Sequence, residues 1–591
     1  MSKVHLLPED VISKIAAGEV IERPASAVKE LIENALDANT TSLKIHLKEA
    51  GKTLIHIKDT GSGIDKEDLE NIFLRHATSK ISSINDLDKI DSLGFRGEAL
   101  YSIAAIADVT LKSKTPGQDS GWEIQMRSGK KISFKPAALP NGTELEIREL
   151  FFNTPARRKF LKSNTTELNQ CLNVIIPYAL FHYHCRFLVT HEGKTLLDLN
   201  PHATVTERMA AILNLNREDL IEKQYHAKES NIAIKAVLGN INIKRPQRDL
   251  QFIFINGRPV QNKGISFHLN QVYQLIFPKG HFPAFAVFIE MPPQDLDVNI
   301  HPTKREVKIK NEYQLTSILR EMCEHALMTQ GQAKQAISPQ SSAISESVIQ
   351  KAIKNDTEKT FETTPAPEFL EDTHAPASSE PYAYPHADAQ AQIQEHLFSV
   401  EDQNLQSKLS RARFLGSFIN KFLIFEFDKS LFVVDQHAAQ ERIAYEAFIR
   451  QMDKGKIEVQ ELLSPITLKL TPQEKVAFER SKDKLEELGL SSSFFDDETL
   501  AIHSYPILLK NPEPAMRHLL SGENISHCDH ETIARRACRS SVMAGDFLNK
   551  EKAEYQRDQL IKCKDPFTCP HGRPTVIEMS EKFLDKQFLR T

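Results

Sequence analysis

Helical and strand-like patterns of apolar residues alternate through the first half of the chain. Residues 12–38 carry apolar side chains at helical spacing, interrupted at Gly18 and Pro24, which predicts helix. Two stretches with a period of two follow at 42–47 and 53–59, and that period is typical of strands. The mixture of the two periods predicts an α/β fold for this part of the chain.

The same patterns recur in two later parts. A helical pattern at 204–213, followed by strand-like runs within 233–291, predicts a second α/β subdomain that begins near His202. The apolar run 422–434 predicts two strands around a turn at 428–430. A separate folded region is therefore expected in the second half.

Between 332 and 406 the periodic patterns disappear and the composition shifts. This segment has six prolines and no glycine, and it is rich in Ser, Thr, Ala and Gln, which is the composition of a disordered linker. The chain is thus expected to divide into folded regions at 1–201 and 202–331, a linker at 332–408, and a folded region at 409–591 with an insertion at about 463–525.

Composition narrows the class of protein. A chain of 591 residues with 40% hydrophobic and 26% charged residues is expected to form several globular domains. The net charge of −5 argues against a uniformly basic nucleic-acid binder. No apolar run is long enough for a membrane span and no signal peptide is evident, so we expect a cytoplasmic, nucleoid-associated protein. Seven scattered cysteines do not suggest a disulfide framework.

Three polar segments in the first folded region fit a nucleotide site. Glu30, Asn34 and Asp37 recur at helical spacing, so a carboxylate and an amide oxygen could activate water and complete a Mg²⁺ shell. Segment 59–63 (DTGSG) offers a carboxylate for an exocyclic amine and glycines that let a flat base approach the backbone. Segment 94–100 (GFRGEAL) opens a helix whose free N–H groups could bind phosphates. Taken alone, segment 59–63 is most often a turn, and a polar helix face is usually only solvated.

Their order and spacing resemble the ATPase family shared by gyrase, Hsp90, histidine kinases and MutL, the GHKL superfamily. Segments 14–26, 75–80, 153–157 and 254–258 narrow the resemblance to MutL mismatch-repair proteins, over nearly the whole first folded region. It implies an α+β sandwich of the GHKL ATPase type, followed by an S5-like α/β transducer subdomain.

The resemblance also implies roles for individual residues. Glu30 matches the general base, Asn34 the Mg²⁺ ligand and Asp59 the residue that reads the adenine amine of ATP. The other implied nucleotide contacts are Gly61, Gly63, Thr78, Lys80, Arg96, Gly97, Thr143 and Lys304. The last of these would reach the γ-phosphate from the second subdomain, so we expect hydrolysis to be linked to subdomain motion and to ATP-driven dimerisation.

Two basic features are candidates for contacts with double-stranded DNA. They are Arg258 and the segment 244–248, whose side chains could bind backbone phosphates. Exposed arginines that serve only solubility are the alternative.

Segment 435–446 (DQHAAQERIAYE) places four potential metal ligands behind the apolar run 422–434. His437 and Glu441 are four residues apart and share a helical face, as two ligands of one ion can. Further on lie Cys538, Cys569 and His571, whose ligand types suit Zn²⁺ or Mn²⁺. The alternatives are a capped, solvated helix or a closed zinc site that only stabilises the domain.

Together with segment 569–574 (CPHGRP) and the terminal 588–590 (FLR), this set resembles the latent endonuclease of MutL proteins that lack a separate strand-nicking enzyme. It implies an α+β dimerisation and endonuclease domain in which Asp435 and Glu441 are catalytic. The residues implied to hold one or two ions are Asp435, His437, Glu441, Cys538, Cys569 and His571. Glu446 would ligate an ion or orient a neighbour.

The linker contains one apolar pair near its end, in the sequence Gln394-Glu-His-Leu397-Phe398. It is similar to Gln-x-x-Leu-Phe peptides that dock on bacterial sliding clamps. A helical entry into the second region is the alternative.

The expected function is that of an ATP-gated homodimeric clamp, which couples a mismatch sensor of the MutS type to nicking of double-stranded DNA. An ATP-dependent matchmaker with a structural metal, which recruits a separate nuclease, is the second hypothesis.

Overall fold

The computed structural model describes residues 17–18, 20–80, 93–94, 97–227, 231–277, 281–297, 307–310, 312–329, 401–509, 511–522, 524–538 and 548–588. The chain forms two compact units, which are described separately. The first comprises Met1–Gly331, Glu461–Ser504 and Leu520–His527, and the second comprises Gln332–Gln460, Tyr505–Leu519 and Cys528–Thr591. Among the described residues no helix is long and apolar enough to cross a membrane.

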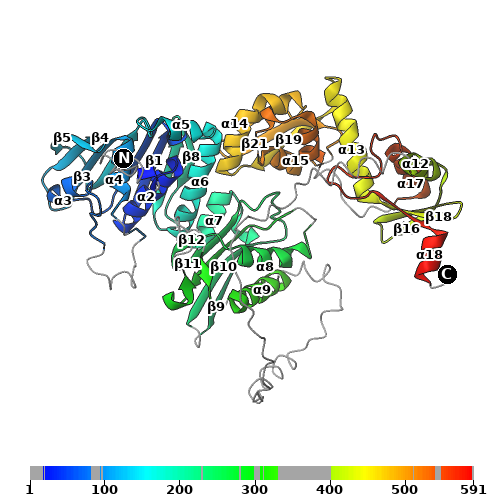
Figure 1. Ribbon diagram of the computed structural model, residues 1–591, viewed down its shortest axis with the longest axis horizontal. Coiled ribbons are helices and arrows are strands. Elements are labelled where there is room, and N and C mark those ends of the chain that lie inside the picture. The colour runs from blue at the N-terminus through cyan, green and yellow to red at the C-terminus, as the bar shows by residue number, and fades with distance from the viewer. Residues whose placement is uncertain are drawn as a thin grey trace, which may run out of the picture. The chain divides into compact units, whose positions relative to one another are not determined.

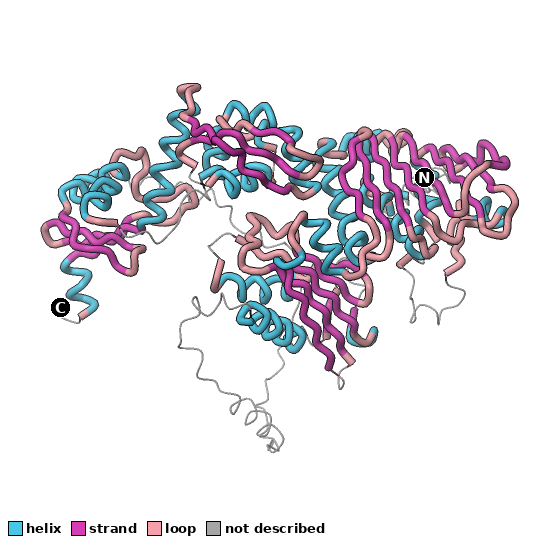
Figure 2. The backbone as a smooth tube through the Cα atoms, turned by 180° about the vertical axis from the view of Figure 1, so that it is seen from behind, coloured by secondary structure: helices cyan, strands magenta, loops and turns pink. Residues whose placement is uncertain are grey.

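An eight-stranded sheet forms the centre of the amino-terminal part of the first unit (Figures 1 and 2). Its order is β5-β4-β3-β6-β2-β1-β7-β8, mostly antiparallel, with β1 parallel to β7. The strands are β1 (Ser42–Lys48), β2 (Leu54–Asp59), β3 (Asp108–Lys114), β4 (Gly121–Arg127), β5 (Lys130–Ala137), β6 (Gly142–Arg148), β7 (Arg186–His191) and β8 (Lys194–Leu199). The strands predicted at 42–47 and 53–59 are confirmed.

The main helices of this part are α2 (Pro24–Asp37), α4 (Ala99–Ile106), α6 (Asn164–Phe181) and α7 (Val205–Leu213), with the short α3 (Lys66–Asn71) and α5 (Pro155–Phe160). Helix α2 starts at Pro24, where the missing N–H costs nothing and the fixed φ suits the first turn. Its apolar side chains Val28, Ile32 and Leu36 are buried in the core between helices and sheet. The polar side of α2 is therefore left for the candidate nucleotide site.

A five-stranded sheet of order β12-β11-β13-β10-β9 follows in the same unit. Its strands are β9 (Leu220–Ala227), β10 (Ile232–Gly239), β11 (Gln251–Ile255), β12 (Arg258–Val260) and β13 (Phe285–Glu290). Helices α8 (Lys263–Gln274) and α9 (Glu312–Thr329) pack together and share a second apolar core with this sheet. The strands β14 (Leu296–Asp297) and β15 (Lys308–Ile309) form a separate pair.

The inserted segment forms a three-stranded sheet of order β19-β21-β20 and a helix. These are β19 (Val459–Lys469), β20 (Ser492–Phe494), β21 (Thr499–Pro506) and α14 (Pro472–Glu487). The Thr471 hydroxyl accepts a hydrogen bond from Glu474 N and the Glu474 carboxylate accepts one from Thr471 N, so α14 begins with a capping box.

The second unit contains a four-stranded sheet of order β16-β17-β18-β22. The strands are β16 (Arg413–Phe418), β17 (Phe422–Phe427), β18 (Ser430–Asp435) and β22 (Val576–Ser580). The helices of this part of the chain are α12 (Glu401–Arg411), α13 (Gln436–Asp453), α15 (Pro512–Leu520), α16 (His530–Cys538), α17 (Lys550–Leu560) and α18 (Glu581–Gln587). The two strands predicted within 422–434 are confirmed, and the turn between them includes Asp428 at a φ of 52°.

Candidate nucleotide and metal sites

The polar face of α2 is already paired with a cation from the chain itself. The ammonium of Lys80 lies 3.0 Å from Asn34 Oδ1 and 2.5 Å from Asp37 Oδ2. The Asp37 carboxylate also accepts hydrogen bonds from the N–H groups of Leu93 and Gly94. The predicted Mg²⁺ ligand, Asn34, therefore points its amide oxygen at a positive charge, so its donor chemistry fits a cation.

A buried carboxylate surrounded by close backbone lies at the end of β2. Asp59 is 8% exposed, and its Oδ1 accepts hydrogen bonds from Gly61 N at 2.8 Å and Thr143 N at 3.3 Å. Burial raises the pKa of Asp59 more than these two hydrogen bonds lower it. A Cβ on Gly142 would lie 2.3 Å from the Asp59 carbonyl oxygen, and a Cβ on Gly63 would lie 2.2 Å from another backbone oxygen. Asp59, Gly61, Gly63 and Thr143 thus lie close together, and their contacts with a nucleotide stay a prediction.

In the described part of the predicted phosphate lid, the backbone at Gly97 lies very close to the backbone at His76 and Ala77. The Thr78 hydroxyl accepts a hydrogen bond from Lys80 N at 3.2 Å. Gly97 has a φ of +61°, and its carbonyl accepts a hydrogen bond from His76 N at 3.1 Å. A Cβ on Gly97 would lie 2.5 Å from the Ala77 carbonyl oxygen, so only glycine fits. The other predicted phosphate contacts, Arg96 and Lys304, lie outside the described residues.

The prediction that Arg245 is an exposed cation available to DNA is wrong. It is 6% exposed, and its guanidinium pairs with Asp249 at 3.2 Å and with Glu474 at 2.9 Å in the same unit. A buried guanidinium needs such partners because an unpaired buried charge is strongly destabilising. Arg258 is only partly buried and begins the edge strand β12.

In the second unit, the junction of β18 and α13 positions two of the predicted ligands. Asp435 is the N-cap of α13, and its Oδ1 accepts hydrogen bonds from His437 N at 2.9 Å and Ala438 N at 3.0 Å. The helix that starts here puts His437 and Glu441 one turn apart, with His437 Nε2 3.3 Å from Glu441 Oε1. Asp435 therefore caps the helix through Oδ1, as the alternative of a capped, solvated helix expects, but Glu441 on this helix is 4% exposed and not solvated.

A tight turn brings the other ligands to α13. Cys569 N donates to Arg573 O at 2.7 Å and Gly572 N donates to Cys569 O at 2.9 Å, with Gly572 at a φ of +77°. His571 Nδ1 lies 3.4 Å from Glu441 Oε2. One ligand atom each of Glu441, Cys569 and His571 lies within 4.8 Å of the others. Among the described residues, the other predicted ligands, Asp435, His437 and Cys538, fall outside this group of three.

The Glu441 carboxylate gives this group a negative charge that favours binding of a cation, whereas His571 and Cys538 have to lose their protons before they can ligate an ion. Burial raises the pKa of Glu441, but hydrogen bonds from His437 and His571 outweigh it and lower the pKa to about 2. Hydrogen bonds to Cys569 and Glu441 raise the pKa of His571 to about 9. Burial raises the pKa of the Cys538 thiol to about 12. His437 Nδ1 and His571 Nε2 are buried without a hydrogen-bond partner, as expected of imidazole nitrogens that ligate an ion.

Glu446 orients the segment that precedes the cysteine turn. Its carboxylate accepts hydrogen bonds from Lys564 N at 2.7 Å and Asp565 N at 3.1 Å. Arg442, one turn before it on α13, pairs with Asp565 at 3.1 Å and donates to Thr568 O at 2.5 Å. Of the two roles considered for Glu446, these contacts favour orientation of a neighbour.

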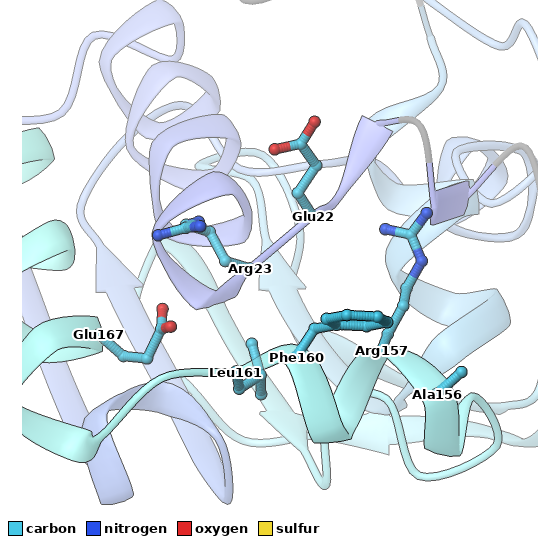
Figure 3. A pocket seen from close by; sticks show the side chains of 7 residues that line it. All are labelled: Glu22, Arg23, Ala156, Arg157, Phe160, Leu161 and Glu167. Carbon is cyan, nitrogen blue, oxygen red and sulfur yellow. The ribbon is translucent and has the colours of Figure 1, made fainter. Parts of the chain in front are cut away.

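Neither site coincides with the cavity of about 360 Å³ in the first unit (Figure 3). None of its lining residues was predicted as a site residue. They are Glu22, Arg23, Ala156, Arg157, Phe160, Leu161 and Glu167. The clamp-binding candidates Gln394, Leu397 and Phe398 lie outside the described residues.

Comparison with known proteins decides the family. Residues 21–149 match the model of the histidine kinase-, DNA gyrase B- and HSP90-like ATPase. Residues 210–328 match the C-terminal domain of DNA mismatch repair protein, and residues 415–548 match the MutL C terminal dimerisation domain. A DNA mismatch repair protein MutL from Endomicrobium trichonymphae is 35% identical, over 99% of this chain and 100% of its own length. The chain belongs to the MutL family of DNA mismatch repair proteins.

Another MutL, from Listeria welshimeri, is 35% identical over 99% of this chain and 98% of its own length. The structure titled Aquifex aeolicus MutL ATPase domain complexed with ADP is 29% identical and has a TM-score of 0.39. The match covers 51% of this chain and 98% of the chain in that structure. The family models that match residues 21–149 and 415–548 confirm the GHKL ATPase and the dimerisation domain expected from the sequence. This MutL-family chain therefore has an ATP-binding ATPase domain and a dimerisation domain, which supports a homodimer.

Proposed function

We propose that this protein is an ATP-gated homodimeric clamp that nicks double-stranded DNA through a metal site in its second unit. The observation that carries the proposal is the group of Glu441, Cys569 and His571, joined by one turn of α13 to His437. A nucleoid-associated protein of this kind would receive its signal from a mismatch sensor of the MutS type. Arg258 is the proposed DNA contact in the first unit.

At the ATP site, Asp59 accepts a hydrogen bond from the adenine amine, which the glycines around it allow to approach. Asn34 contributes its amide oxygen to Mg²⁺, and the pairing of that oxygen with the Lys80 ammonium supports the assignment. When bound with ATP, Mg²⁺ neutralises developing phosphate charge. Glu30 lies one turn before Asn34 on α2, and we assign it as the base that takes a proton from the attacking water.

At the metal site, Glu441, Cys569 and His571 hold Zn²⁺ or Mn²⁺, with His437 and Cys538 as further ligands. A bound ion of this kind supplies Lewis-acid polarisation of a phosphodiester. The low pKa of Glu441 keeps its carboxylate charged at neutral pH, which favours binding of a divalent cation. We assign Asp435 as a further ligand through Oδ2, because Oδ1 accepts both hydrogen bonds of the helix cap.

The second candidate is a matchmaker whose metal only stabilises the domain. The use of Asp435 as a helix cap favours it, because a cap alone explains why an aspartate stands there. Thiolate ligands are also common in structural zinc sites.

Nicking of supercoiled plasmid in Mn²⁺ separates the two. Asp435→Asn keeps the cap, since asparagine caps helices as well as aspartate, but it removes the carboxylate charge. The nuclease proposal predicts that Asp435→Asn loses nicking while it retains ATP hydrolysis. It predicts that Glu30→Ala loses ATP hydrolysis while it keeps its fold. Asp428→Asn, at the exposed turn between β17 and β18, is the matched control and should nick like wild type. Equal nicking by Asp435→Asn, or none by wild type, supports the matchmaker.

A further inference from the structure

A chain of polar contacts connects Glu30 to the last turn of helix α6. The Lys29 ammonium lies 3.1 Å from Glu30 Oε1 and 2.9 Å from Glu33 Oε2. The other oxygen of Glu33 accepts a short hydrogen bond from the Tyr178 hydroxyl. These contacts place Lys29 between two carboxylates, and within the described part of the chain the Glu33 carboxylate also bonds to another helix.

Glu33 is the buried anchor of this chain. It is 6% exposed, and Tyr178 is 3% exposed, whereas the side chain of Glu30 is 29% exposed. Burial raises the pKa of Glu33, and burial beside Glu33 raises that of Tyr178. Loss of its donors would leave Glu33 as an unpaired buried carboxylate, which costs several kcal/mol of stability. The contacts of Glu33 with Lys29 and Tyr178 are therefore strongly favoured.

The anchoring helix also contacts the five-stranded sheet of the same unit. Phe181, one turn after Tyr178, has ring centroids at 5.4 Å from Phe254 and 6.0 Å from Phe288. A Cβ on Gly257 would lie 3.4 Å from the Phe181 ring. The Arg258 charge acts on the Tyr178 hydroxyl and lowers its pKa, against the larger effect of burial. Packing of the second sheet on the end of α6 thus bears on the position of Tyr178.

We propose that Lys29, Glu33 and Tyr178 are positioning residues for the Glu30 carboxylate. Tyr178 fixes Glu33, Glu33 fixes the Lys29 ammonium, and Lys29 holds the exposed Glu30 carboxylate in one orientation. The inference rests on the proposed role of Glu30 as general base. The inference adds a physical connection from the five-stranded sheet to Glu30, through α6 and α2.

Steady-state ATP hydrolysis by the full chain tests the inference. Lys29→Met should lower kcat by roughly 10- to 100-fold, the effect of displacing a catalytic group by about 1 Å, and should leave KM for ATP unchanged because the adenine pocket at Asp59 is untouched. Lys29→Arg should restore much of kcat, since a guanidinium also bridges two carboxylates. Tyr178→Phe should lower kcat in the same way, with unchanged KM.

Tyr183→Phe is the matched control, because its hydroxyl takes no part in this chain of contacts, and it should behave as wild type. A kcat for Lys29→Met that equals or exceeds the wild-type value overturns the inference. A rise in the KM of Lys29→Met for ATP, together with a lower melting temperature, also overturns the inference, because it indicates that the variant has lost structure. If Glu30→Ala hydrolyses ATP normally, the base assignment itself fails. If Glu30→Ala is inactive while Lys29→Met is normal, only the positioning role fails.

Discussion

Removal of the proposed metal should make the stability of the second unit depend on pH above neutrality. In the metal-free protein, His571 is held in its charged form by Cys569 and Glu441, which raise its pKa from 6.5 to about 9. A raised pKa in the folded state stabilises the fold fully below 6.5, where the unfolded chain also binds the proton. This stabilisation is lost as the pH rises from 6.5 through 9.

The size of the effect follows from the shift. At about 1.4 kcal/mol per pH unit, a rise from 6.5 to about 9 corresponds to at most about 3 kcal/mol. The His571 side chain is 20% exposed and shares the Glu441 carboxylate with His437, so we expect roughly 1–2 kcal/mol. The stabilisation from the low pKa of Glu441 is fully present above pH 4.5 and is lost only as the pH falls from 4.5 to about 2, so it does not change in this window.

Urea unfolding of the chelator-treated full chain between pH 6 and about 10 measures this loss of stability. The unfolding transition of the second unit is identified as the one that shifts when Zn²⁺ is restored. His571→Gln should remove the pH dependence in this window. Glu441→Gln should reduce it, because one of the partners that hold the proton is neutralised. If His571→Gln and wild type lose the same stability between pH 6.5 and 9, the reasoning is refuted, and another group titrates.

Three further predictions concern other parts of the chain. Asp59→Asn should abolish ATP binding, measured with a fluorescent nucleotide, because its amide group offers a donor to the adenine amine; normal affinity would remove Asp59 from the site. Glu446→Ala should weaken Zn²⁺ binding roughly 10- to 100-fold in a competition titration, with Glu446→Gln closer to wild type; equal affinities would limit Glu446 to stability. The pair Leu397→Ala and Phe398→Ala should abolish clamp-stimulated nicking, and unchanged stimulation would place the docking site elsewhere.

The local features of both sites could be predicted from the sequence. Spacing on one helix predicts that Glu30, Asn34 and Asp37 share a face, and the change from strand to helix at Asp435 follows from apolar periodicity and a capping residue. Residues within a single element, or at its ends, are positioned by backbone geometry that the residue types themselves favour.

Contacts between distant segments could not be predicted. Tyr178 is 145 residues from Glu33 and stands in an ordinary apolar helix pattern, so only the packing of α6 against α2 reveals it. Lys29 and Glu33 did carry a signal, since opposite charges four residues apart on a helix often pair. The burial of Arg245 depends on carboxylates 4 and 229 residues away, which a basic segment in the sequence does not indicate.

The ammonium of Lys80 beside Asn34 has a consequence for nucleotide loading. If Asn34 holds the Mg²⁺ of ATP, as proposed, the ion would arrive at an oxygen that already faces an ammonium, and repulsion between the two cations would favour displacement of Lys80. That displacement would release Asp37 from the same partner and leave an ammonium for the incoming phosphates. On this proposal, nucleotide binding exchanges one counter-ion for another at the polar face of α2.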